Sequence, residues 1–170
     1  MSHAIKEVPR HALRFRAGAF TLAATESNAP GAVPARFLAR TGQPIDHWYW
    51  GRLVHDMAGL RLHKPRLVID YCHGEECGFA EQFQVDADGN LIAGGAIVLT
   101  SDPGDVGRMI VERSKGGVPY EASIDFDGEG LVIEEVAAGA TAEVNGYQFQ
   151  GPGAIAREWS LRGVAVCPYG

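Results

Sequence analysis

Short runs in which apolar and polar residues alternate recur along most of the chain. Such alternation, with a period of two residues, is typical of strands that bury one face. A few runs are instead continuously apolar and β-branched, which favours strands buried on both faces. We predict strands at residues 13–22, 34–40, 66–72, 79–85, 91–100, 119–126, 131–136, 140–144, 147–149 and 155–167.

Turn-forming residues separate several of these runs. The stretch 86–90 reads DADGN and joins two predicted strands into a hairpin, and Asn145-Gly146 is the signal of a type I′ hairpin turn. The stretch 127–130 reads DGEG, and we predict a turn there as well. The aromatic-rich segment 45–62 is interpreted as core packing with a loop.

One helix interrupts the strands. Ser101 and Asp102 offer a capping side chain before Pro103, and Val106, Met109 and Ile110 form an apolar stripe at helical spacing. Lys115 followed by two glycines favours an end at that point. We therefore predict a helix over 103–115.

The predicted elements define a fold class: mainly β with one or a few helices. The simplest architecture is a small β-barrel, because closure of the sheet removes exposed strand edges. We expect one domain over residues 13–170, preceded by a flexible tail at residues 1–12.

Composition narrows the functional classes. The chain has 170 residues, a net charge of −6 and 46% hydrophobic residues, which exclude wholesale disorder. The negative charge and the lack of a basic run argue against nucleic-acid binding. No apolar run approaches the ~20 residues of a membrane span, and the first residues lack a signal-peptide pattern. We expect a soluble intracellular protein with no membrane partner.

The three cysteines, Cys72, Cys77 and Cys167, are expected to be free thiols in a reducing compartment, because their number is odd. Cys72, His73 and Cys77 do not reach a four-ligand zinc pattern. We expect no metal and no cofactor. The histidines at 47, 55 and 63 are interpreted as surface or core residues.

His73 and Ser123 carry the candidate chemistry. No Walker loop, dinucleotide fingerprint, H-E-x-x-H or G-x-S-x-G motif is present. His73 follows a predicted buried strand, and Ser123 lies inside a later one. A serine hydroxyl becomes a nucleophile when an imidazole lies within hydrogen-bond reach, and adjacent strands of a barrel supply such geometry.

From about residue 45 onward the chain resembles the tailed-phage prohead proteases, relatives of the herpesvirus assemblins. The resemblance is carried by LVIDYCHG, by a helix ending in KGGVP before YEASIDF, and by VNGYQFQGP and AREWSLRGVAV. It implies a β-barrel flanked by helices and a serine endopeptidase that needs no cofactor. The nucleophile falls on Ser123 and the general base on His73.

The resemblance also implies substrates and a place of action. These are scaffold and major capsid proteins, cleaved during head maturation inside the immature capsid in the host cytoplasm. Chains of this family often carry a longer C-terminal part that is removed by self-cleavage. Cleavage preference and self-association stay open.

The closing strand departs from the family pattern. Many members carry a glutamate where this chain has Gly163. We expect Glu158 to orient His73, or failing that Glu143, with a catalytic dyad or a feeble enzyme as the alternatives. Arg157 and Arg162 are candidates for anchoring an oxyanion donor or water, or are plain surface charges.

Two other functions stay open. The missing acid at Gly163 is compatible with an inactive scaffold or assembly protein on the same fold. A small-molecule-binding barrel is the second alternative, and it would require a large enclosed apolar cavity.

Overall fold

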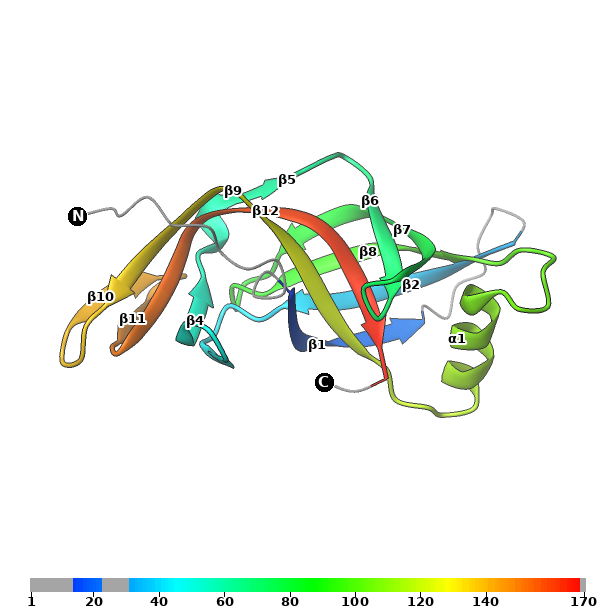
Figure 1. The fold of residues 1–170 in the computed structure, drawn as a ribbon, viewed down its shortest axis with the longest axis horizontal. Helices are drawn as coiled ribbons and strands as arrows, with labels where there is room; N and C mark the ends of the chain where they lie inside the picture. The colour runs from blue at the N-terminus through cyan, green and yellow to red at the C-terminus, as the bar shows by residue number, and fades with distance from the viewer. Residues whose placement is uncertain (1–13, 23–30, 169–170) are drawn as a thin grey trace.

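The computed structural model describes residues 14–22 and 31–168 (Figure 1). In this part of the chain the one α-helix is α1 (Val106–Lys115), and Met57–Gly59 form a 3-10 helix. The strands are β1 (Arg14–Leu22), β2 (Ala32–Arg40), β3 (Ile45–His47), β4 (Gly51–His55), β5 (Leu60–Leu62), β6 (Leu67–Tyr71), β7 (Glu75–Val85), β8 (Leu91–Val98), β9 (Glu121–Val136), β10 (Thr141–Val144), β11 (Tyr147–Gln150) and β12 (Gly153–Cys167).

Seven strands close into a barrel. Their order is β12-β6-β7-β8-β2-β1-β9, and β9 pairs with β12 to complete the ring. The predicted fold class, a mainly β small barrel, is confirmed. Strands β4 and β5 pair with β12, and β3 pairs with β4. Strands β10 and β11 form a separate hairpin at the opposite end of the molecule from α1 (Figure 1). The predicted tail at residues 1–12 lies outside the described residues.

The two longest strands are β9 and β12, which pair over most of their length. The predicted turn at 127–130 is wrong, because both flanks of this stretch pair antiparallel with β12 and the chain does not reverse. Asp127 lies opposite Ser160, and Val132 lies opposite Glu158. The intervening glycine-rich residues are a bulge, and Gly130 has a φ of +72° that favours glycine.

The predicted turn at Asn145-Gly146 is confirmed. Both residues have positive φ, 48° and 80°, and Val144 pairs with Tyr147 across the turn. The Asn145 amide also donates to the carbonyl oxygens of Gly42 and His55. The hairpin of β10 and β11 is therefore tied to the barrel.

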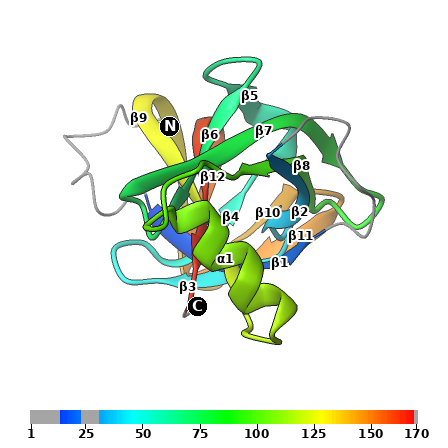
Figure 2. The ribbon, with the colours of Figure 1, turned by 90° about the vertical axis from the view of Figure 1, so that its right-hand side faces the viewer.

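The helix begins later than predicted. Asp105 caps it, and its carboxylate accepts from the backbone N–H groups of Gly107 and Arg108. The predicted capping residues lie in the preceding loop, because only the Asp105 carboxylate reaches the first free N–H groups of the helix. Val106 and Ile110 are buried, and Figure 2 shows α1 lying across one end of the barrel.

Alternate strand residues fill the barrel interior. Phe37, Ile97 and Ile124 are completely buried, and they belong to one continuous cluster with residues from α1. A smaller cluster, which includes Val54 and Phe149, lies beneath the β10–β11 hairpin.

The segment 45–62 holds three short strands and a 3-10 turn, more regular structure than the predicted loop. His55 is completely buried beside Trp159, and Nε of Arg40 donates to its Nδ1 over 3.0 Å. Burial lowers the pKa of Arg40 to about 9 despite the opposing effect of Tyr147. Burial, and then the Arg40 charge, lower the pKa of His55 well below its ordinary value. The sequence left His55 as either a surface or a core residue, and the structure places it in the core.

Candidate functional site

Ser123 lies on the outer face of strand β9. Its neighbours Ala122 and Ile124 point into the barrel core, so alternation places the Ser123 side chain on the other side of the sheet. Ser123 is nevertheless completely buried. It pairs with Ala165 of β12 on one side and with Arg16 of β1 on the other.

His73 lies in the tight turn between β6 and β7. The N–H of Gly74 donates to the Tyr71 carbonyl, and the two central residues, Cys72 and His73, have φ of 53° and 59°. This left-handed conformation costs a non-glycine residue about 1–2 kcal/mol, and such strain is concentrated at functional sites. The N–H of Cys72 also donates to the Val166 carbonyl, which fixes the turn beside the end of β12 (Figure 1).

The turn brings His73 onto Ser123. Nε2 of His73 and Oγ of Ser123 are 2.8 Å apart, a hydrogen-bond distance between the β6–β7 turn and a strand that pairs with neither β6 nor β7. The sequence analysis named this pair, and the structure brings it together.

The strand register sets a row of residues across the outer face beneath His73. Ala165 of β12 lies opposite Ser123 of β9 and, on its other side, opposite Asp70 of β6. Leu67 and Ile69 point into the core, so Asp70 is on the same outer face as Ser123. Ala165 is completely buried although it lies on this face. Oδ1 of Asp70 and Nδ1 of His73 are both shielded from solvent.

The acids predicted to orient His73 are placed elsewhere, and that expectation is corrected. Glu158 pairs with Arg61 at 2.6 Å and lies opposite Val132 on the part of β12 beyond the bulges. The stretch from 158 to 165 of an extended strand spans about 23 Å. Glu143 belongs to the β10–β11 hairpin, and its carbonyl accepts from Arg157. Glu158 is therefore far from His73 in space, although it is close in sequence to Gly163.

The two arginines are also away from the hydroxyl of Ser123. Arg157 forms ion pairs with Asp56 and Glu134 at 2.8 and 2.6 Å. Burial lowers its pKa, but the hydrogen bonds to these two carboxylates outweigh that effect and raise it overall. Arg162 is exposed at the bulge of β12, with Nε 3.8 Å from Asp127. Their contacts are those of structural and surface ion pairs.

The cysteines are free thiols, as expected. Cys77 and Cys167 are buried and Cys72 is exposed. Burial, together with the charge of Asp70, raises the pKa of Cys77 to about 12, so this thiol stays protonated. Among the described residues no cluster of histidine, cysteine and carboxylate side chains has the arrangement of a metal site.

Asp70 is the residue that the sequence reasoning missed. Asp70 is the one charged residue within LVIDYC, the run that directly precedes His73. What that pattern lacks is the pairing of β6 with β12, which places Asp70 in the row of Ser123.

The comparisons with known proteins add no relative. No family model, curated protein or solved structure matches this chain. Within residues 14–22 and 31–168, no helix is long and apolar enough to cross a membrane.

Proposed function

We propose that the chain is a serine endopeptidase of the prohead type, with Ser123 as the nucleophile and His73 as the general base. The observation that carries this proposal is the 2.8 Å contact between Nε2 of His73 and Oγ of Ser123. A nucleophile and a general base within hydrogen-bond reach are two of the groups that acyl transfer requires, and the base here is held in a strained turn.

The reaction proceeds in two halves. The Ser123 hydroxyl donates to Nε2, and as Oγ bonds to the peptide carbonyl carbon the proton passes to His73. The imidazolium returns this proton to the leaving nitrogen as the C–N bond breaks, leaving an acyl-enzyme. Water then attacks the ester, giving one proton to His73, and the proton returns to Oγ as the carboxyl product leaves.

We assign the orienting role to Asp70. Two strand spacings, about 9.6 Å, separate the backbones of β9 and β6. An imidazole with a hydrogen bond at each ring nitrogen spans about 8 Å, so a ring lying over Ala165 bridges from Ser123 to the Asp70 carboxylate. Such a ring also accounts for the complete burial of Ala165. The Asp70 carboxylate on β6 then takes the role of the glutamate that many prohead proteases carry at the position of Gly163.

The substrates follow from the resemblance to prohead proteases. We propose scaffold and major capsid proteins, cleaved inside the immature capsid in the host cytoplasm. The chemistry of serine, imidazole and carboxylate requires no cofactor.

An inactive assembly protein on the same fold is the second candidate, and one observation favours it. Ser123 is completely buried, so a substrate carbonyl reaches Oγ only after neighbouring side chains move. In an assembly protein the contact between His73 and Ser123 would be a structural hydrogen bond.

A fluorophosphonate probe separates the two candidates, because it reacts with an activated serine hydroxyl. We expect one adduct, located by peptide mapping at Ser123, and none in Ser123→Ala. The matched control Ser101→Ala changes a serine in an exposed loop and retains labelling. In cleavage of a scaffold or capsid precursor, Ser123→Ala abolishes turnover, and its thermal unfolding stays close to wild type. A folded wild-type chain that stays unlabelled after prolonged incubation is the assembly protein.

A further inference from the structure

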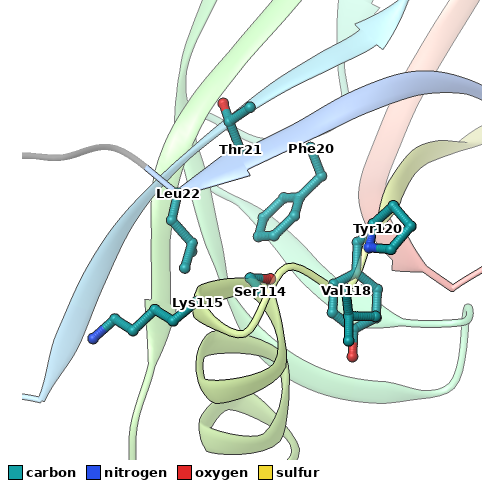
Figure 3. Close-up of a pocket in the computed structure, with 8 residues that line it drawn as sticks. Phe20, Thr21, Leu22, Ser114, Lys115, Val118 and Tyr120 are labelled. Atoms are coloured by element: carbon teal, nitrogen blue, oxygen red, sulfur yellow. The ribbon is translucent and has the colours of Figure 1, made fainter.

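A pocket of about 430 Å³ lies at the end of the barrel that α1 covers (Figure 3). Its walls include Phe20 and Leu22 at the end of β1, Ser114 and Lys115 in the last turn of α1, and Val118 and Tyr120 before β9. This volume is within the range of small-molecule sites. Tyr120 belongs to the core cluster inside the barrel and Ser123 lies on the outer face, so the pocket is separate from the proposed catalytic site.

Two hydroxyl groups of the pocket residues lack a hydrogen bond to any described residue. Oγ of Ser114 and Oη of Tyr120 are both buried, and neither has a partner within residues 14–22 and 31–168. Tyr120 as a whole is only 6% exposed. A buried hydroxyl without a partner destabilises the fold, and native proteins keep few of them. A ligand that forms hydrogen bonds with these two hydroxyl groups would supply the partners that they lack.

The charge among the residues that line the pocket is positive. Lys115 supplies an ammonium group at the rim, and the lining residues include no carboxylate. The apolar part of the wall comes from Phe20, Leu22 and Val118. The Val118 side chain is 41% exposed and lies in front of the Tyr120 ring in Figure 3. Its backbone is held, because the Val118 N–H donates to the Arg113 carbonyl, so a shift at this position is one of the exposed side chain.

We propose that this pocket binds a small acidic aromatic ligand of the phenol-carboxylate class. The aromatic ring packs against Phe20 and Leu22. A phenolic hydroxyl bonds the Ser114 and Tyr120 hydroxyls after a shift of Val118, and the carboxylate pairs with Lys115. This proposal does not depend on the catalytic roles of Ser123 and His73.

Calorimetric titration with three probes tests the ligand class. 3-(4-Hydroxyphenyl)propionate has both polar groups, 3-phenylpropionate lacks the hydroxyl, and tyramine replaces the acid by an amine. We expect the first probe to bind about tenfold more tightly than either of the others, the factor that one well-made hydrogen bond or charge pair supplies. Lys115→Gln should remove the preference for the acid over the amine.

Tyr120→Phe supplies a second, independent readout. It should weaken binding of the phenol probe about tenfold. It should also leave the unfolding temperature equal or higher, because it deletes a buried hydroxyl that has no partner. The matched control is Tyr49→Phe at an exposed tyrosine of the β3–β4 turn, which should change neither quantity.

Two outcomes overturn the proposal. Equal or undetectable binding of all three probes would mean that the pocket holds water alone. A lower unfolding temperature of Tyr120→Phe would mean that its hydroxyl is already bonded within the protein.

Discussion

Replacement of Asp70 by asparagine tests the proposed third member of the catalytic site. The change keeps the size and shape of the side chain but removes its negative charge, and Asp70 is only half-buried. We therefore expect the unfolding free energy to change by less than about 1 kcal/mol. The effect should appear in the reaction, where a carboxylate holds the imidazole in one tautomer and stabilises the imidazolium.

The expected magnitude follows from the bridge between Ser123, His73 and Asp70. A carboxylate about 4 Å from an imidazolium, at an effective dielectric constant of about 20, stabilises it by about 4 kcal/mol. Loss of this stabilisation in the transition state corresponds to about a 10³-fold fall in kcat. The rising limb of kcat/KM against pH should also move to lower pH, because an imidazole without a neighbouring negative charge loses its proton more readily.

The assay is hydrolysis of a scaffold or capsid precursor, or the rate of fluorophosphonate labelling, measured between about pH 5 and 8. Glu158→Gln is the matched control, because its carboxylate pairs with Arg61 far from His73, and its rates should equal those of wild type. Asp125→Asn probes another carboxylate on the outer face, two residues beyond Ser123, and should have a small effect. A folded Asp70→Asn protein with wild-type rate and pH profile would refute the reasoning.

Three further outcomes are expected. Cys72→Gly should stabilise the fold by about 1 kcal/mol in urea unfolding, because glycine adopts the left-handed φ of 53° without strain; a loss of stability would show that the turn is unstrained. His55 has a pKa well below its ordinary value in the folded chain, so below about pH 6.5 the unfolded chain binds a proton that the folded chain does not. Stability should therefore fall by about 1.4 kcal/mol per pH unit as the pH drops from there, and a His55→Gln variant with the same slope would contradict this origin. Ile124→Ala should cost about 2–5 kcal/mol, because this side chain is completely buried in the barrel; a loss below about 1 kcal/mol would mean that the core collapses around the site.

Local patterns determined much of the fold. Alternation and short apolar runs predicted most barrel strands within a few residues, because both patterns are properties of the segment itself. Strand β9 was predicted as two strands. Asn145-Gly146 predicted its hairpin, since both positions require positive φ. The helix end at Lys115 was also correct, whereas its start was placed too early, because several capping side chains precede Val106 and only the one that meets the free N–H groups acts as the cap.

Tertiary structure alone decided which residues meet. DGEG at 127–130 has the composition of a turn, but pairing of both flanks with β12 keeps the chain running straight. His73 and Ser123 were named from sequence, and their contact at 2.8 Å depends on a strained turn bonded to Val166. The position of Glu158 could not be predicted for the same reason. Glu158 is near Gly163 along the chain, whereas Asp70 reaches the site through the pairing of β6 with β12. The register between strands determines which residue of a neighbouring strand lies opposite a given residue. This register depends on contacts distant in sequence, so a local sequence pattern does not predict it.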